Sequence, residues 1–416
     1  MKRRALFLLM IFAGIVMVFG NGQQSTKSAP EGIVWAGWSV QDDAPWMIDN
    51  WNQQHPDKKI TWVGWPWNDV STQMLIRSQG NERIDLGQTD ISTIATLTGS
   101  DILVNWNDVL GSAYLNDNFE AAALSMGNFG GKQLGLPWVV ASIGMVFNPE
   151  ILAKAGFNEP PVTVPEFERC LEAIAKLPGD IIPYGVCTKE SVAAYDFIPW
   201  LWTFGGRIYD QNKNVILNNP QGVQTFAWYK SLVDRNLIRL NINRDDSRQL
   251  FAQGRMAFYD DAVMANGIAI ANGVPKERIP QVIRPMVRPV LKAGDTPRSM
   301  LWGHMLVIFN KSPVKNDVVE LTKYILNKDV ALRYYKEAGM LPVLKSVLDS
   351  PEIQNDVWAK NWSKITATGE LGEFDLNPQV NQLNTIIEEE LQACLVGTKT
   401  PQQAANDAAS RISNVR

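Results

Sequence analysis

The sequence predicts an α/β protein with two domains. The chain has 416 residues, which is more than one hydrophobic core usually organises. Strand-like and helix-like segments alternate from residue 32 onward, as in a parallel sheet covered by helices. The composition is that of a folded globular protein, with 45% hydrophobic and 20% charged residues. Length, alternation and composition therefore agree on two α/β units.

The first part of the chain alternates three strands with two helices. We expect strands over 32–38, 59–65 and 84–88, and helices over 44–55 and 68–80, the first of which ends before Pro56. In an open α/β sheet, ligands bind beyond the carboxyl ends of the strands. The loops that follow these three strands are therefore the first place to look for a site.

The middle of the chain repeats the pattern, and the last third is mostly helical. An apolar run over 139–148 predicts a buried strand. Thr163, followed by Pro165 and Glu166, is a helix cap candidate. Helices are expected over 150–156, 165–177, 220–235, 317–326, 329–338, 380–395 and 401–412.

The amino terminus has the pattern of an export signal. Lys2, Arg3 and Arg4 precede an uncharged apolar run over 5–19, and small residues follow at Gly20 and Gly22. We predict a signal peptide over 1–22 and a linker over 23–30. A membrane anchor is the alternative, although the run is shorter than the roughly 20 apolar residues of a spanning helix.

Charge and cysteine content exclude several classes of function. The net charge is -4, and loss of the three leader cations would give -4 - 3 = -7. A mildly acidic chain argues against nucleic acid and anionic membrane as partners. Cys170 and Cys187 are expected in the core, with a bridge between them as the alternative. His55 and His304 lack partners at metal-ligand spacing, so neither a metal nor another cofactor is predicted.

Several motifs in order resemble the family 1 extracellular solute-binding proteins, the maltose-binding-protein-like group. The resemblance covers residues 31–416. The motifs are GKQLGLPW at 131–138 with MVFNPEILAKAGF at 145–157, PPVTVPEF at 160–167, FGGRIYD at 204–210, LFAQGRMAF at 250–258, SPVK at 312–315 and AGMLPV at 338–343. Val164 and Pro149 depart from the family's usual residues at their positions.

The resemblance implies a periplasmic-binding-protein-like II fold, in which two α/β lobes are joined by a hinge of several crossings. By comparison, the crossings fall near Val139–Ile143, His304–Val307 and Leu341–Lys345. The expected lobes are 31–141 with 305–345, and 142–304 with 346–416. The ligand is expected between the lobes, which close around it.

Tryptophan is the best clue to the ligand. There are 15, and eight of them lie between Trp35 and Trp106. An indole can cover the apolar face of a sugar ring while carboxylates and amides bind its hydroxyls. The candidate ligand-binding residues are Trp38, Asp42, Asp43, Trp65, Trp67 and Asp90 near the first strands, and Trp138, Trp200, Trp202, Asp260, Trp302 and His304 near the hinge and in the second lobe.

Each group of candidates also has a structural interpretation. Asp42 and Asp90 precede predicted helices and can act as caps. In a helix, Trp200 and Trp202 would diverge and one would be a core residue. His304 can bind a ligand hydroxyl or be a satisfied core histidine.

The predicted function is capture of a neutral sugar or polyol for an ABC importer. The three loops after the first strands contain no Arg or Lys, which disfavours an anionic ligand. The permease subunits and their ATPase are the expected partners of a monomeric, exported protein, and the chain has no phosphate-binding loop of its own. The alternatives are a secreted glycoside hydrolase, which would need two suitably spaced carboxyls, and a binding partner of a membrane sensor.

Overall fold

The computed structural model describes residues 32–38, 40–80, 82–189 and 192–415, apart from the side chains of Asp42, Asp43 and Asn68. The predicted signal peptide and linker lie outside these ranges. Within the described ranges, every helix is too short or too polar to span a bilayer.

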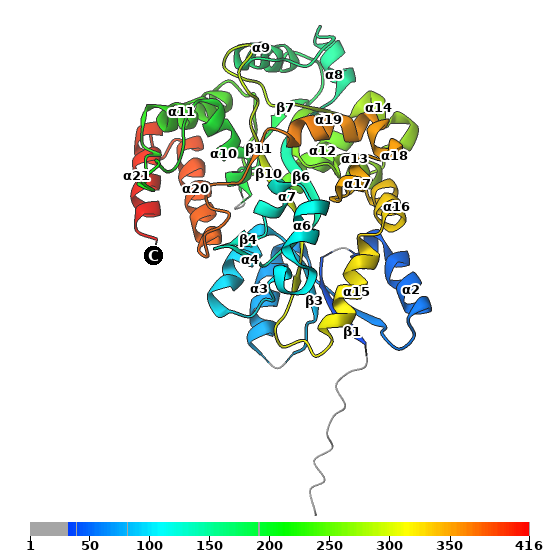
Figure 1. Ribbon diagram of the computed structural model, residues 1–416. Helices are drawn as coiled ribbons and strands as arrows, with labels where there is room; N and C mark the ends of the chain where they lie inside the picture. The colour runs from blue at the N-terminus through cyan, green and yellow to red at the C-terminus, as the bar shows by residue number, and fades with distance from the viewer. Residues whose placement is uncertain (1–31, 39, 81, 190–191, 416) are drawn as a thin grey trace, which may run out of the picture. The chain divides into compact units, whose positions relative to one another are not determined.

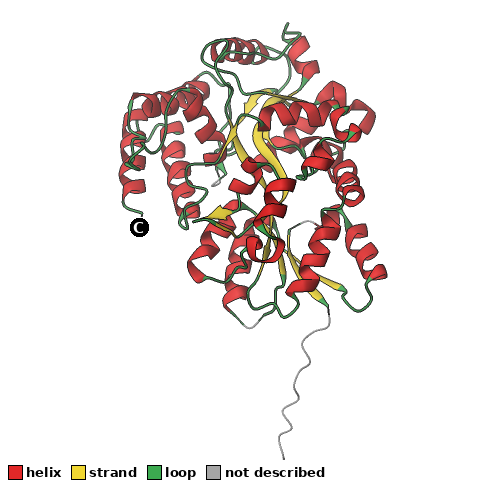
Figure 2. Cartoon of the chain, in the orientation of Figure 1, coloured by secondary structure: helices red, strands yellow, loops and turns green. Residues whose placement is uncertain are grey.

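The centre of the fold is a nine-stranded mixed sheet (Figure 2). Its main order is β2-β1-β3-β10-β6-β8-β7, and β9 and β11 pair with β6 and β10. The strands are β1 Ile33–Gly37, β2 Ile60–Gly64, β3 Leu86–Thr89, β6 Leu136–Phe147, β7 Ile182–Gly185, β8 Met256–Asp261, β9 Arg284–Met286, β10 Ser299–Ile308 and β11 Gly369–Glu370. Strands β4 Asn128–Phe129 and β5 Lys132–Gln133 form a separate hairpin.

The first three strands run parallel, as the alternation of strands and helices predicts. Strand β1 pairs in parallel with both β2 and β3, so the carboxyl ends of all three lie at one edge. Trp38 directly follows β1, and Trp67 follows β2 after two residues. These two tryptophans therefore leave the sheet at the same edge.

Strands β6 and β10 join the two ends of the sheet. They pair antiparallel with Met300 opposite Ile143 and Leu306 opposite Leu136. Beyond this stretch β10 continues onto β3, and β6 continues onto β8 and β9. The expected crossings at 139–143 and 304–307 lie in these two strands, whereas Leu341–Lys345 forms no strand and makes one bridge, from Leu344 to Phe119. The predicted lobe boundaries stay a prediction.

Helices cover both faces of the sheet (Figure 1). In the first part of the chain they are α1 Val40–Asp43, α2 Pro45–Gln54, α3 Trp67–Gln79, α4 Ile91–Leu97, α5 Trp106–Leu110, α6 Ser112–Asn118, α7 Ala121–Ser125, α8 Pro149–Lys154, α9 Val164–Ile174 and α10 Ala193–Thr203. The later ones are α11 Pro220–Asp234, α12 Arg244–Ala252, α13 Ala265–Ala271, α14 Ile279–Val282, α15 Lys315–Ile325, α16 Lys328–Ala338, α17 Lys345–Leu348, α18 Pro351–Gln354, α19 Val357–Thr366, α20 Val380–Leu395 and α21 Pro401–Ser413.

Helix α9 shows how local sequence determines an element. Thr163 caps its start and Glu166 reaches back to the Thr163 backbone, so both form a capping box, as the sequence predicts for Thr163. The helix then buries Phe167, Cys170 and Leu171 against the core. Cys170 and Cys187 are buried as predicted, but no disulfide joins them, so the alternative of a bridge between them is wrong.

Candidate functional site

Three half-buried indoles surround His304 at the edge where β1 and β2 end. The ring centroids of Trp38, Trp67 and Trp302 lie 5.7, 5.1 and 4.9 Å from that of His304. Trp38 and Trp67 also meet edge to face at 5.4 Å. We call these four residues the indole cluster. Its members come from the ends of two parallel strands and from β10.

A buried amide fixes the centre of the indole cluster. Gln88, in β3, is fully buried, and its Nε2 lies 3.0 Å from His304 Nδ1. The backbone N–H of Trp38 donates to Gln88 Oε1 at 3.1 Å. Burial lowers the pKa of His304 to about 3, so the imidazole is neutral at physiological pH.

The start of α4 carries a second group of polar side chains. Asp90 caps the helix, accepting from the Thr93 backbone N–H at 2.8 Å and from the Ser92 hydroxyl. The hydroxyl of Tyr195, from α10, lies near that of Ser92. Burial, and then the charges of Asp375 and Asp90, raise the pKa of Tyr195.

Asp375, from the loop before α20, completes this second group. Its side chain is buried and accepts from the Gly372 backbone N–H at 2.7 Å. Burial raises the pKa of Asp375 to about 7, and the Asp90 carboxylate adds to the shift. Two carboxyls therefore lie near Tyr195, one from the first part of the chain and one from the last.

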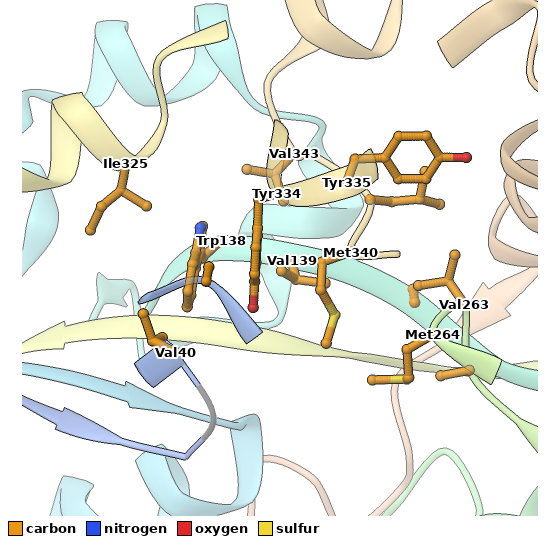
Figure 3. Packing of buried hydrophobic residues seen from close by; sticks show 14 of the residues in the cluster. Val40, Trp138, Val139, Val263, Met264, Ile325, Tyr334, Tyr335, Met340 and Val343 are labelled. Carbon is orange, nitrogen blue, oxygen red and sulfur yellow. The ribbon is translucent and has the colours of Figure 1, made fainter. Parts of the chain in front are cut away.

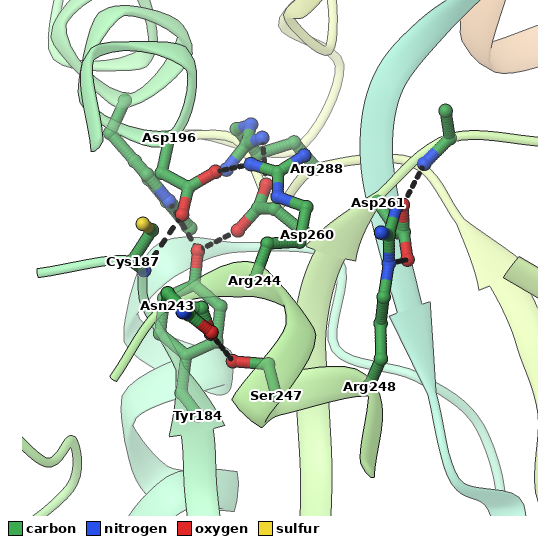
Figure 4. A network of polar contacts seen from close by, with 12 residues as sticks. Tyr184, Cys187, Asp196, Asn243, Arg244, Ser247, Arg248, Asp260, Asp261 and Arg288 are labelled. Atoms are coloured by element: carbon green, nitrogen blue, oxygen red, sulfur yellow. Dashed lines mark hydrogen bonds and ion pairs between the residues drawn. The ribbon is translucent and has the colours of Figure 1, made fainter. Parts of the chain in front are cut away.

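The end of β8 lies in a buried network of ion pairs (Figure 4). Asp260 accepts from Arg288 and from the Tyr184 hydroxyl, and the Arg288 guanidinium lies 4.9 Å from the Trp200 ring centroid. Both Asp260 and Arg288 are buried. The Asp260 carboxylate therefore makes its hydrogen bonds to other buried side chains.

The arginines of α12 are paired in the same region. Arg244 donates to Asp196, and Arg248 binds Asp261 through two bonds of 2.9 and 2.8 Å. Their guanidinium charges are therefore balanced by buried carboxylates.

The comparisons with known proteins identify the family. The sequence profile of a family described as bacterial extracellular solute-binding protein matches residues 46–361. The chain belongs to this family. Family membership supports solute capture, the function that the sequence predicts, over hydrolysis.

Relatives of this solute-binding protein include proteins named for two ligand classes. The arabinooligosaccharide-binding protein of Bacillus subtilis is 26% identical over 323 residues, which cover 75% of this chain and 70% of the relative. The sn-glycerol-3-phosphate-binding periplasmic protein of Escherichia coli is 22% identical over 393 residues, covering 88% and 87%.

A solved structure matches the fold of the solute-binding protein over nearly its whole length. It is an ABC transporter solute-binding protein of Thermotoga lettingae bound with α-D-tagatose, with a TM-score of 0.81 and 22% identity. The match covers 91% of this chain and 98% of the chain in that structure. The α/β periplasmic-binding-protein architecture expected from the sequence is confirmed.

Trp138 lies in β6, near the predicted crossing, but its side chain is buried. It is 4% exposed and stacks on Tyr334 of α16, with ring centroids 5.0 Å apart and an interplanar angle of 6° (Figure 3). The space beside the pair holds about 10 Å³, which is room for no more than about one water. Trp138 is a core residue, and the ligand contact predicted for it is not supported.

Trp200 and Trp202 are also buried. Trp200 is 0% exposed, and its indole N–H donates to the Tyr184 hydroxyl at 2.9 Å. Trp202 donates to Glu373 Oε1 at 2.8 Å and lies under Arg207. Both residues are in helix α10. Because side chains two positions apart point to different sides of a helix, the two indoles pack against different neighbours. Trp200, Trp202 and Asp260 are therefore buried in the core of this structure, and their predicted contacts with a ligand stay a prediction.

The remaining predicted residues are Trp65, Asp42, Asp43 and Asp90. Trp65 is half-buried, and the Arg77 guanidinium lies 5.3 Å from its ring centroid. Asp42 and Asp43 belong to the short helix α1, and their side chains are outside the described ones. Asp90 is a helix cap, as its structural interpretation predicts, and also faces Tyr195.

A groove lies at the other end of α4 from Asp90. It has a volume of about 440 Å³ and is lined by Leu97, Thr98, Asp101, Ile102, Leu103, Phe129, Gly130, Lys132, Leu134 and Leu376. None of the predicted ligand residues lines this groove. Among the described residues no cluster of three or more acidic, histidine or cysteine side chains has the geometry of a metal site.

Gln88, Tyr195 and Asp375 are candidate site residues outside the set of predicted ligand contacts. Gln88 lies in β3, one residue before its end, so its position near the carboxyl end of a parallel strand is a usable signal. Tyr195 and Asp375 belong to segments more than 100 residues from Asp90, and only tertiary packing brings them together. A single sequence carries no local pattern for such a contact.

Proposed function

We propose that this protein captures a neutral sugar or polyol between its two predicted lobes and passes it to the permease subunits of an ABC importer. It would act outside the cytoplasm, after export by the predicted signal peptide. The observation that carries the proposal is the gathering of Trp38, Trp67 and Trp302 around His304. The family and the tagatose-bound structure of similar fold support it.

The chemistry of the cluster suits a sugar. An indole face covers the apolar C–H face of a pyranose or furanose ring, while nearby polar groups bind the hydroxyls. Asp90 and Tyr195 offer acceptor and donor oxygens beside α4. A hydroxyl-rich ligand uses both kinds of contact, which an apolar ligand cannot.

Charge favours a neutral ligand over an organic phosphate. Arg244 and Arg248 are each held by buried aspartates, and Asp90 and Asp375 would repel an anion. The relative named for sn-glycerol 3-phosphate makes the anionic class a specific alternative. The compound sn-glycerol 3-phosphate is therefore the negative control for the ligand screen.

A thermal-shift screen tests the ligand class. We expect at least one of D-tagatose, arabinotriose, maltose and myo-inositol to raise the melting temperature in proportion to the logarithm of its concentration, because binding to the folded state stabilises it. We expect sn-glycerol 3-phosphate to leave it unchanged. A shift with the phosphate and none with any neutral sugar or cyclitol would overturn the proposal.

We also propose that the protein binds its ligand without catalysis. The carboxyl pair of a glycoside hydrolase needs one free acid and one free base or nucleophile, and Asp260 is held by Arg288 and Tyr184. Prolonged incubation with the oligosaccharide selected by the screen should return it intact on chromatography. Release of shorter sugars would favour the hydrolase alternative.

A further inference from the structure

We infer that His304 donates a hydrogen bond from Nε2 to an oxygen of the bound ligand, and that a ligand must present an acceptor at this point among the indoles. The inference rests on the proposed function, because it concerns the same site. It adds the identity of one specificity-determining group, its tautomer and the direction of its hydrogen bond.

The tautomer of His304 follows from the orientation of Gln88. The Gln88 Oε1 accepts from the Trp38 backbone N–H, so the Nε2 of the same amide is its donor end. That amine faces His304 Nδ1 at 3.0 Å, and Nδ1 must therefore be the acceptor. A neutral imidazole has one proton, which leaves it on Nε2.

The Nε2–H group is a donor without an acceptor. His304 Nε2 is buried and has no hydrogen-bond partner among the described residues. Buried N–H groups nearly always have one, because leaving such a donor unpaired costs free energy. The indole rings nearest to His304 are those of Trp38, Trp67 and Trp302, with Trp138 at 6.4 Å, and an indole ring supplies no acceptor nitrogen. The unpaired donor thus lies in the same cluster that is proposed to hold the sugar ring.

Ligand binding requires a movement that opens the indole cluster. Nε2 is closed off from solvent in this conformation, so an oxygen reaches it only when a neighbouring group moves aside. Trp38 and Trp67 are the candidates, because both are half-buried and lie where the chain leaves the strands β1 and β2. Binding should therefore change tryptophan fluorescence, and a sugar that lacks the matching oxygen should bind more weakly.

Nitrogen NMR of the two histidines tests the tautomer directly. The chain has only His55 and His304, so ¹⁵N-histidine labelling gives two imidazoles, and His55→Asn assigns them. His55 stacks on Trp51 with a partly exposed side chain and serves as the internal control. We expect His304 to stay neutral with its proton on Nε2 from pH 5 to 8. A proton on Nδ1, or a charged ring in this range, would overturn the inference.

The same spectra test the hydrogen bond to the ligand. The probes are D-tagatose, arabinotriose, maltose and myo-inositol, of which the one with the largest thermal shift is used at saturation. We expect the Nε2–H proton of His304 to move downfield and to exchange more slowly with water, while His55 does not change. An unchanged Nε2–H signal in the saturated protein would mean that a ring face, not the ligand, accepts this bond.

Substitution of His304 gives an independent measure. His304→Phe keeps a flat ring and removes the donor, and should weaken binding of the selected sugar at least tenfold. His304→Gln keeps an N–H donor and should recover part of that loss. Equal affinity of wild type and His304→Phe, with both proteins folded by melting temperature, would overturn the inference while leaving the proposed function intact. Absence of binding by the wild type to every probe would instead overturn the proposed function.

Discussion

At the scale of single residues, burial divides the predicted tryptophans into two groups. Trp38, Trp67 and Trp302 are half-buried and meet at His304, whereas Trp138 and Trp200 are core residues. The sequence shows that tryptophans follow strands, and this selects Trp38 and Trp67. It does not show which indoles the helices α10 and α16 will cover, because that depends on contacts between distant segments.

Asp375 gives a prediction at this scale. Its pKa is raised from 3.8 to about 7 in the folded protein, so the folded state binds the proton more tightly than the unfolded chain does. The ionised carboxyl therefore destabilises the fold, and this cost grows as the pH rises from about 4 to about 7. The upper bound is about 4 kcal/mol, from roughly three pH units at 1.36 kcal/mol each.

Asp375→Asn should accordingly stabilise the protein at pH 8 and lose that advantage at pH 4.5. The amide oxygen can still accept from the Gly372 N–H, so the loop contact is kept. Denaturant unfolding at the two pH values measures the effect, and the exposed Asp349→Asn is the matched control. A stability difference that is the same at both pH values would contradict the explanation.

At the scale of elements, the stack of Trp138 from β6 on Tyr334 from α16 joins the sheet to a helix that covers it. The GKQLGLPW motif correctly placed Trp138 beside the crossing strand. Because side chains alternate along a strand, a shift of one residue decides between the sheet's two faces, and the motif alone could not choose.

Trp138→Ala should therefore act on stability. Truncation of a buried tryptophan leaves a cavity and typically costs about 3–5 kcal/mol. We expect the midpoint of urea unfolding to fall, and the affinity of the folded protein for the selected sugar to stay unchanged. If Trp138→Ala instead lost affinity for the selected sugar tenfold while keeping the stability of the wild type, Trp138 would be a ligand contact.

At the scale of the whole molecule, the order of elements is what the sequence predicts best. The parallel strands β1, β2 and β3 and the helices α2, α3, α20 and α21 lie within a few residues of their expected bounds. Helical and strand periodicity are local properties, and caps such as Thr163 mark the ends. The insertion of β10, an antiparallel strand, between β3 and β6 joins residues about 160 to 220 positions apart, and no local pattern predicts it.

The proposed function depends on an uncharged ligand held by the half-buried tryptophans of the indole cluster. Isothermal titration of the selected neutral sugar into wild type, Trp67→Ala and Trp46→Ala tests this most directly. Trp46 is an equally half-buried indole, on α2, covered by Arg333 and outside the indole cluster. We predict at least a tenfold loss of affinity for Trp67→Ala, wild-type affinity for Trp46→Ala, and similar melting temperatures for all three. Wild-type affinity in Trp67→Ala would contradict the account.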